Sequence, residues 1–404
     1  MSTERVVIIG ASHAAAELIP SLKKFGWQGE VALIGQEALL PYQRPPLSKA
    51  YFQGQLEKSK LLIKPESAYE HVDTYLNTRA TKINAEAKTL ELSSGEVLSF
   101  TKLVLATGTS ARKLPLDGAK AEHIHTLRTF DDVERIRDSI PDKGRLLIVG
   151  AGYIGLEVAA SAVKQGTSVV VLEAQDRVLQ RVTSAKVSEF YSQQHRAHGV
   201  DIRLGAQLKC FTDIDGVRSA VLQDGTNIEF DSALIGIGVI PNVELAKDIG
   251  LTCDNGIVVD HQCRTDNPDI YAIGDVSNQY SDLYKRRMRL ESVPNALEQA
   301  KKTAASICQR DFLDNFVPWF WSDQYDLKLQ TAGVFNDYDQ LVMRSGDGDK
   351  KMSVFYLKEQ HLLACDAINS AVEFMVAKKL ILQNKKLDAS LLADPMVPIK
   401  TLLV

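Results

Sequence analysis

Two glycine-rich turns are the part of this chain whose residue types and spacing most clearly suit a chemical role. The second turn reads GAGYIG over 150–155 and follows an apolar run at 145–150. Glycines at this spacing allow a tight turn, a close approach of the backbone to a pyrophosphate and close helix–strand packing. The next apolar run ends at Glu173, and an acid there binds a ribose 2′-hydroxyl and repels a 2′-phosphate. The turn therefore predicts an NAD site, with a ligand-free glycine turn as the alternative.

The first turn, GASHAA over 10–15, departs from the usual pattern. Ser12 places a Cβ where close approach of a phosphate normally excludes one. The strand-like run that follows ends near Gln36, so an amide stands where the ribose acid is usual, and Glu37 comes one place later. By itself this turn fits a second dinucleotide or a structural role equally well. The choice between Gln36 and Glu37 as the ribose contact stays open.

Two further strand-like runs end in small residues and favour a flavin at the first turn. ATG stands at 106–108 and IYAIGD at 270–275. Ligands of open α/β sheets lie at the carboxyl ends of strands, where Asp275 can accept from ribityl hydroxyls or simply cap a turn. A helix expected at 294–308, with Ser292 near its cap, can point its positive end at the flavin ring. Two dinucleotide sites in one chain indicate FAD and NADH exchanging a hydride.

Composition argues against several other classes of protein. The net charge of −4 speaks against a nucleic-acid partner. None of the five cysteines precedes Cys210 and none forms a CxxC pair, so neither a metal site nor a dithiol is expected. No apolar run approaches the ~20 residues that cross a bilayer, so no membrane partner is expected. No secretion signal is visible, and a cytoplasmic protein is expected.

Apolar strands alternate with helical patterns through about the first 240 residues, which is typical of a mostly parallel sheet. After Pro318 the pattern changes to strands followed by two helical stretches. The predicted fold class is α/β, with two Rossmann-like dinucleotide-binding domains and a C-terminal α+β domain. The strands expected outside the parallel pattern are 217–223, 227–235, 328–334, 340–344 and 352–357.

Eight motifs together resemble one enzyme family. They read GASHAAAE, PYQRPPLSK, LVLATG, GAGYIGLE, GIGVIPN, IYAIGD, RLESVPNALEQA and PWFWSDQYDLKLQ. The set is similar to the FAD-dependent NADH:ferredoxin and rubredoxin reductases of bacterial oxygenase systems, which are glutathione-reductase-like flavoproteins. The resemblance runs from Val6 to about Lys400. It implies a discontinuous FAD domain at 1–110 and 240–317, an NAD domain at 111–239 and a C-terminal domain at 318–404.

Motifs and resemblance together assign the cofactor contacts. The candidate FAD residues are Gly10, Ser12, Ala14, Ala15, Gln36, Glu37, Arg44, Lys49, Ala80, Thr107, Gly108, Arg128, Gly274, Asp275 and Val293. The candidate NAD residues are Gly150, Gly152, Ile154, Gly155, Glu157, Glu173 and Gly238.

Lys49 and Glu157 resemble a catalytic pair near the flavin N5 and the nicotinamide. An ammonium beside N5 favours the electron-rich flavin, and a carboxylate keeps that ammonium oriented. The alternatives are a solvated loop lysine and an acid on a helix face.

The absence of a cysteine in the N-terminal part of the chain indicates how electrons leave the flavin. Disulfide- and peroxide-reducing relatives place cysteines against the flavin, whereas here the PPLSK segment occupies that region, so electrons must leave the flavin directly. Trp319 and Trp321 would share one face of an extended strand, with Phe320 on the other. By resemblance Trp321 lies where the redox partner docks; packing between domains is the alternative. Lys301 and Lys302 are candidates for a basic docking patch, although such helix faces are usually just solvated.

The expected function is an NADH-dependent ferredoxin reductase that passes single electrons to a small acidic [2Fe–2S] ferredoxin, in a cytochrome P450 system. A rubredoxin reductase of an alkane hydroxylase system is the nearest alternative. A diaphorase-like reductase of small acceptors, or an NADH-responsive flavoprotein like the apoptosis-inducing factors, are further alternatives.

Overall fold

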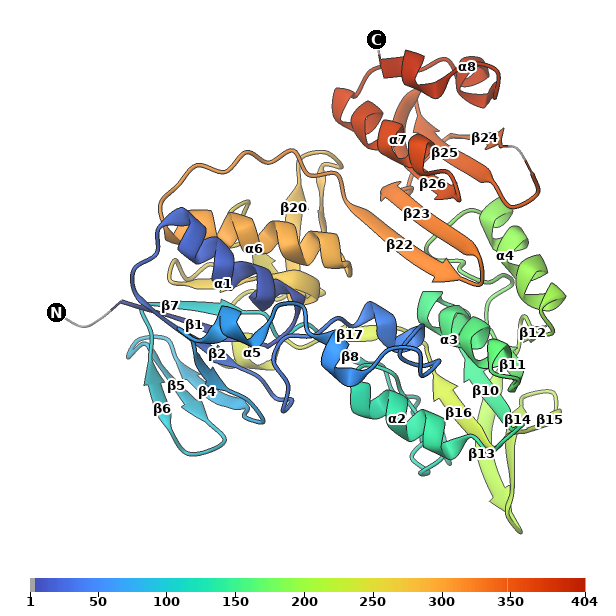
Figure 1. Cartoon of the computed structure of the whole chain (residues 1–404), viewed down its shortest axis with the longest axis horizontal. Helices are drawn as coiled ribbons and strands as arrows, with labels where there is room; N and C mark the ends of the chain where they lie inside the picture. Colours follow the sequence, from blue (N-terminus) through green and yellow to red (C-terminus); the bar gives the residue numbers. More distant parts are fainter. Residues whose placement is uncertain (1–3, 347, 404) are drawn as a thin grey trace. The chain divides into compact units, whose positions relative to one another are not determined.

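A computed structural model describes residues 4–346 and 348–403 (Figure 1). The chain divides into two compact units and crosses between them five times, with two of the crossings within β8 (Thr109–Ala111) and β17 (Val239–Pro241). The first unit comprises the described residues of Met1–Gln43, with Ser59–Ser110 and Ile240–Pro318. The second comprises Arg44–Lys58, Ala111–Val239 and the described residues of Trp319–Val404. Residues 44–58, which lie inside the predicted FAD stretch, thus cluster with the second unit.

The first unit is built on a parallel sheet ordered β19-β7-β1-β2-β3. Two helices cover one face of this sheet, and a small antiparallel sheet together with a short third helix covers the other. The strands are β1 (Arg5–Ile9), β2 (Glu30–Ile34), β3 (Asp73–Tyr75), β7 (Lys102–Leu105) and β19 (Ile270–Ala272); the helices are α1 (His13–Phe25) and α6 (Val293–Ile307) on the first face and α5 (Glu244–Asp248) on the second; the antiparallel sheet is β4 (Ala80–Asn84), β5 (Thr89–Leu92) and β6 (Val97–Ser99); and a mixed sheet is formed by β18 (Ile257–Val259), β20 (Ser277–Ser281) and β21 (Arg286–Met288).

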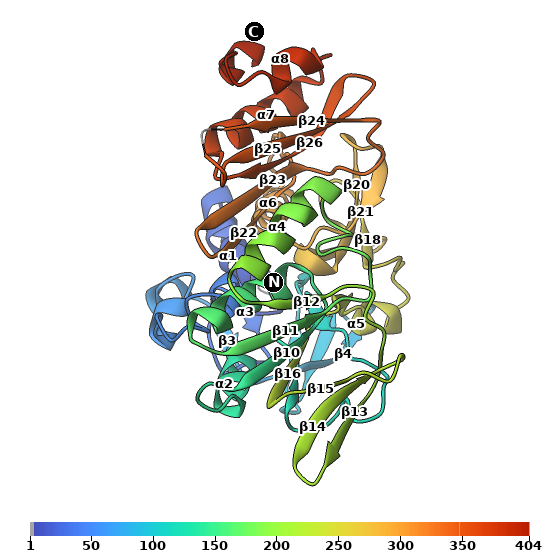
Figure 2. The same ribbon diagram turned by 90° about the vertical axis from the view of Figure 1, so that its right-hand side faces the viewer.

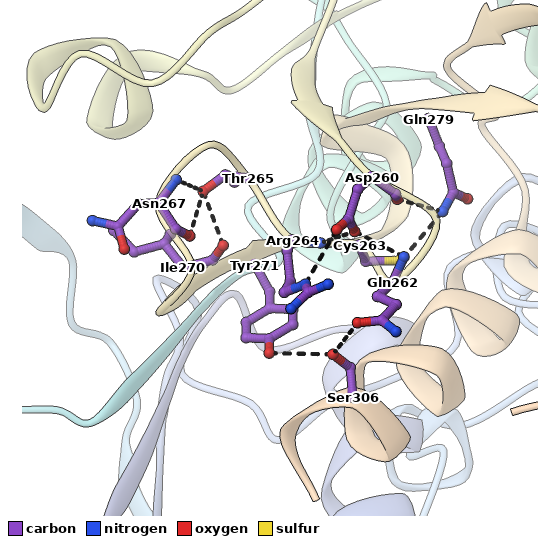
Figure 3. A network of polar contacts seen from close by, with 10 residues as sticks. All are labelled: Asp260, Gln262, Cys263, Arg264, Thr265, Asn267, Ile270, Tyr271, Gln279 and Ser306. Atoms are coloured by element: carbon purple, nitrogen blue, oxygen red, sulfur yellow. Dashed lines mark hydrogen bonds and ion pairs between the residues drawn. The ribbon is translucent and has the colours of Figure 1, made fainter. Parts of the chain in front are cut away.

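A polar network fixes the loop that leads into β19 (Figure 3). The Asp260 carboxylate accepts from the backbone N–H groups of Gln262, at 2.8 Å, and Arg264, at 2.9 Å. The Ser306 hydroxyl of α6 contacts the Tyr271 hydroxyl at 3.3 Å and donates to Gln262 at 3.1 Å. The loop, β19 and α6 are thereby tied together just before the turn that carries Asp275.

The second unit contains the other parallel sheet, ordered β12-β11-β10-β16-β9. A three-stranded antiparallel sheet, β13-β14-β15, precedes β16 in the chain, as expected from the 217–223 run. Its second hairpin takes only the start of the 227–235 run, and the rest of that run joins the parallel sheet. The elements are β9 (Ile124–His125), β10 (Arg145–Val149), β11 (Ser168–Leu172), β12 (Asp201–Arg203), β13 (Leu208–Ile214), β14 (Val217–Leu222), β15 (Asn227–Glu229), β16 (Ser232–Ile235), α2 (Phe130–Ser139), α3 (Tyr153–Lys164) and α4 (Ala185–Ala197).

The same unit includes the C-terminal sheet, which is antiparallel and ordered β22-β23-β26-β25-β24 (Figure 2). The α+β expectation for this part is therefore confirmed. The elements are β22 (Trp319–Gln324), β23 (Leu327–Gly333), β24 (Gln340–Ser345), β25 (Met352–Lys358), β26 (His361–Ile368), α7 (Ala371–Gln383) and α8 (Ala389–Ala393).

His195 joins α4 to the β22–β23 turn within the second unit. Its Nε2 lies 2.8 Å from Gln324 Oε1, and its Nδ1 lies 2.9 Å from the Tyr325 hydroxyl. The ring is buried, and this burial lowers the pKa of His195 from 6.5 to about 4. The folded protein therefore keeps the ring neutral at a pH where the unfolded chain would protonate it.

The His195→Gln variant is expected to lose less stability in acid than the wild-type protein does. The stability that the neutral ring provides is complete above pH 6.5 and is lost as pH falls toward 4, because the unfolded state binds the extra proton. This loss in the free energy of unfolding amounts to about 2 kcal/mol by pH 5. Urea unfolding at pH 7.5 and pH 5 measures it, with exposed His71→Gln as the control. An equal acid loss in wild type and His195→Gln would contradict the assignment.

Candidate dinucleotide sites and a buried ion pair

The three glycines of the 150–155 turn differ in what surrounds them. Gly150 has φ +104°, and a Cβ there would lie 2.5 Å from the Gly236 carbonyl oxygen. A Cβ on Gly155 would lie 2.2 Å from the Gly150 carbonyl oxygen. A Cβ on Gly152, by contrast, would meet nothing within 4 Å. The chain itself requires the outer two glycines, whereas Gly152 leaves open space at the start of α3, where a phosphate can approach free N–H groups.

Glu173 follows β11 and holds the same turn in place. Its carboxylate accepts from the backbone N–H of Ala151 at 2.7 Å and from that of Gln175 at 2.9 Å. Each carboxylate oxygen retains a second lone pair, which a ribose hydroxyl can use. Ile154, one of the candidate contacts, is an exposed apolar side chain on the first turn of α3.

Arg181 is a residue that the sequence analysis missed. It is exposed, and its Nη2 lies 3.5 Å from the position of a Cβ on Gly238. Gly238 follows β16, which runs parallel to β10, so the guanidinium lies toward the sheet edge that carries the 150–155 turn. A single arginine in a loop carries no spacing signal, and only the fold brings it there.

In the first unit, three segments converge near Gly274. Gly10 has φ +117°, and a Cβ there would lie 2.1 Å from the Ala106 carbonyl oxygen. A Cβ on Gly274 would lie 3.7 Å from Ala14 and 3.8 Å from Ala296. The first turns of α1 and α6 therefore reach the same place as the 274–276 turn. Their small residues let these three backbone segments come close together, which fits the cradle that a dinucleotide needs. Ala15 is buried on α1, and Ser12 is its N-cap residue.

The remaining FAD candidates of this unit lie at strand ends. Thr107 donates to the Asn242 carbonyl and its own carbonyl accepts from the Asn242 amide, each at 2.8 Å. Asn242 also donates its backbone N–H to the Gly108 carbonyl at 3.0 Å. Half-buried Asp275 lies in a turn whose Gly274 N–H donates to Gln299 of α6 at 2.8 Å. Val293 is the first residue of α6, Ala80 is the first of β4, and Ser292 caps α6 as expected.

Gln36 and Glu37 occupy different environments beyond β2. Gln36 is exposed, whereas half-buried Glu37 accepts a hydrogen bond from the Tyr42 hydroxyl at 2.5 Å. Two further FAD candidates belong to the second unit, where Arg44 Nη1 donates to the Arg128 carbonyl at 2.6 Å.

Lys49 and Glu157 form a buried ion pair. Glu157 lies on α3 with 2% of its side chain exposed, and its Oε2 is 2.6 Å from Lys49 Nζ. The same carboxylate accepts from the Ser48 hydroxyl at 2.5 Å and from the Ser322 hydroxyl at 2.6 Å. The structure thus brings the two predicted residues together and adds two serines that the sequence analysis did not single out. Both serines lie inside motifs that carry the family resemblance, PPLSK and PWFWSDQ. Their place in these motifs was the only sequence signal that pointed to them.

The aromatic segment at the start of β22 alternates as expected. The rings of Trp319 and Trp321 lie 5.7 Å apart on one face of the strand. Phe320 instead packs against Tyr153 of α3, with ring centroids 4.5 Å apart.

One of the two lysines predicted for a basic patch is placed differently. Lys302 is buried, with 8% of its side chain exposed, and its Nζ forms a 2.5 Å ion pair with Asp314. The prediction of Lys302 as a docking residue is therefore wrong, because this position of α6 faces the protein interior. Lys301 is 42% exposed and lies 4.0 Å from Glu17.

Within residues 4–346 and 348–403, no helix is long and apolar enough to cross a membrane. No group of three possible metal ligands occurs among these described residues. All five cysteines are free thiols.

Comparisons with known proteins show the family to which this chain belongs. The model of the pyridine nucleotide-disulphide oxidoreductases matches residues 4–300, and the model of the reductase C-terminal domain matches residues 319–403. Putidaredoxin reductase of Pseudomonas putida is 42% identical over 410 aligned positions, covering 100% of this chain and 97% of that protein. A rubredoxin-NAD(+) reductase of the same species is 36% identical over 90% of this chain and 95% of its own.

A solved structure supports the same assignment. The crystal structure of the covalent putidaredoxin reductase–putidaredoxin complex matches with a TM-score of 0.95 and 41% identity, over 99% of this chain and 98% of that chain. The fold class predicted from the sequence is confirmed. The chain belongs to the pyridine nucleotide-disulphide oxidoreductases, among the ferredoxin and rubredoxin reductases, and is an oxidoreductase that binds FAD and NAD(H).

Proposed function

We propose that this protein is an NADH-dependent reductase of a small acidic [2Fe–2S] ferredoxin that serves a cytochrome P450 monooxygenase. The observation that carries the proposal is the buried Lys49–Glu157 pair in a chain with no cysteine before Cys210. Residues 45–49 offer an ammonium where disulfide-reducing relatives offer thiols, so electrons reach the partner without a protein disulfide. The putidaredoxin reductase relative and its complex with putidaredoxin favour an iron–sulfur partner.

The proposed NAD site uses the 150–155 turn, with Glu173 on the ribose, Gly238 at the sheet edge and Arg181 beside it. The proposed FAD site uses the first turn of α1, the 106–108 and 274–275 turns and the start of α6. The further FAD contacts proposed from the resemblance are Arg44, Lys49, Ala80 and Arg128. FAD held there would supply the chemistry that connects a two-electron hydride donor, NADH, to a one-electron acceptor.

The ion pair positions the positive charge that the proposed reduction of the flavin needs. The Lys49 ammonium stabilises an electron-rich flavin, and Glu157 fixes where that ammonium points. Ser48 and Ser322 hold the carboxylate in one orientation from two different segments. Because Ser322 follows Trp321 directly, the same contact also fixes the strand that carries the proposed electron exit.

We further propose that Trp321 and Lys301 contact the ferredoxin and that the protein works in the cytoplasm, where five free thiols are usual. A rubredoxin partner is the second candidate, since rubredoxin reductases are 36% and 34% identical to this chain.

Steady-state turnover with NADH tests the partner. A [2Fe–2S] ferredoxin is expected to give saturable turnover and a kcat/KM at least tenfold above that of rubredoxin. Trp321→Ala is expected to lower kcat/KM for the ferredoxin, whereas Trp27→Phe, in the first unit, leaves it unchanged. A higher kcat/KM for rubredoxin would overturn the ferredoxin assignment. Slow turnover with both carriers, together with dimerisation on NADH addition, would favour the NADH-responsive alternative.

Glu173→Gln is expected to weaken the preference for NADH over NADPH by about tenfold, on the order of 1.4 kcal/mol. The amide keeps an acceptor for the Ala151 N–H but loses the charge that repels a 2′-phosphate. The measurement is the ratio of kcat/KM for the two nucleotides, with Glu229→Gln, an acid of the hairpin, as the control. An unchanged ratio would remove Glu173 from the ribose site.

A further inference from the structure

A buried aspartate in the C-terminal sheet has a role that neither the cofactors nor the ion pair explains. Asp366 lies on β26 with 1% of its surface exposed. Its carboxylate accepts from the hydroxyls of Tyr356 and Thr331, each at 2.6 Å, and from the hydroxyl of Thr183. Burial raises the pKa of Asp366 above its usual value. An apolar residue would fill such a position at lower cost, so the hydrogen bonds themselves need an explanation.

The first connection of Asp366 runs to the segment that follows Glu173. Thr183 lies at the end of that segment, directly before Ser184, the N-cap residue of α4. The backbone N–H of Ser184 donates to the Tyr356 hydroxyl at 3.2 Å, and Tyr356 donates in turn to Asp366. Two hydrogen-bonded links therefore hold the end of the 173–184 segment on the C-terminal sheet.

The second connection runs to the start of α3. The Thr331 hydroxyl, which donates to Asp366, belongs to β23, and Thr331 pairs with Phe320 of β22. The ring of Phe320 packs on Tyr153, the residue after Gly152. The start of α3 therefore packs against the strand that pairs with β23.

We propose that Asp366 is a positioning residue for the NAD site, acting through Thr183 and Tyr356 on the segment after Glu173. That segment is bound to the 150–155 turn, because the Leu179 N–H donates to the Ala151 carbonyl at 2.9 Å. The C-terminal domain would then set the affinity for NADH from outside the nucleotide-binding domain. The inference rests on the proposed assignment of the 150–155 turn to NAD.

Thr183→Val is the sharpest test, because valine has nearly the shape of threonine and the change leaves Asp366 two of its three donors. It is expected to raise the KM for NADH about fivefold with kcat close to wild type. Tyr356→Phe, which removes the hydroxyl between Ser184 and Asp366, is expected to give the same increase. The double variant is expected to add little to either, because both changes release the same end of the 173–184 segment. Ser353→Ala is the control, since this buried hydroxyl of the same sheet has no hydrogen-bond partner among the described residues.

Two outcomes overturn the inference in distinguishable ways. If Thr183→Val lowers the thermal midpoint but leaves the KM for NADH unchanged while Gly152→Ala raises it, the NAD site stands and Asp366 is only structural. If Gly152→Ala also leaves the KM unchanged, the assignment of the 150–155 turn fails and the positioning role falls with it.

Discussion

Gly152→Ala is expected to raise the KM for NADH by about 10- to 100-fold, on the order of 1.4 to 2.8 kcal/mol, while the thermal midpoint changes little. The added Cβ would meet nothing within 4 Å in the protein, and the backbone of Gly152, at φ −79°, suits alanine. The methyl group would therefore occupy only the space that we assign to the pyrophosphate. Steady-state kinetics with varied NADH, alongside thermal unfolding, provide the measurement.

Gly155→Ala is the matched contrast to this variant. Its Cβ would lie 2.2 Å from the Gly150 carbonyl oxygen, so the turn and α3 must move apart. This variant is expected to lose thermal stability as well as NADH affinity. A Gly152→Ala protein with the KM of wild type, or with the instability of Gly155→Ala, would contradict the assignment of open space at Gly152 to a bound phosphate.

Glu157→Gln is expected to slow the reduction of the flavin by saturating NADH by about 10- to 100-fold. The amide still accepts hydrogen bonds but no longer holds the Lys49 ammonium by charge. Removing one partner of a buried ion pair is also expected to cost stability, here about 2 kcal/mol because Lys49 is 18% exposed. Anaerobic stopped-flow absorbance follows the flavin, and urea unfolding measures the stability.

Lys49→Met provides the second arm of the same experiment. It leaves the Glu157 carboxylate buried with only the Ser48 and Ser322 hydroxyls, and should slow flavin reduction similarly. The double variant is expected to be more stable than the sum of the single losses predicts, because the pair is removed as a unit. Flavin reduction at the wild-type rate in both single variants would mean that the pair is structural and takes no part in the hydride step.

The parts that sequence alone could predict are those governed by local geometry. The positive φ of Gly150 and the close approach at Gly155 leave glycine almost no substitute. The glycine spacing in the sequence is therefore enough to predict this turn. The Ser292 cap and the alternation of Trp319 and Trp321 are likewise properties of short segments. They follow from backbone chemistry and need no knowledge of the fold.

The parts that sequence could not predict depend on which distant segments meet. Lys302 looks like its neighbour Lys301 in the sequence, yet one position along α6 turns it toward the interior and Asp314. The donors of Asp366 come from three separate segments, around 183, 331 and 356, with no shared spacing. Arg181 likewise lies near the 150–155 turn only because β10 pairs with β16, the strand that precedes Gly238.

The most direct test of the central proposal is a double-mixing stopped-flow experiment without oxygen. The holoprotein is first reduced with one equivalent of NADH and then mixed with an excess of oxidised [2Fe–2S] ferredoxin. The flavin absorbance is expected to return as two equivalents of ferredoxin are reduced, at a rate that saturates with ferredoxin concentration. A flavin that stays reduced in the presence of ferredoxin, or that is reoxidised only by small acceptors, would contradict the proposed function.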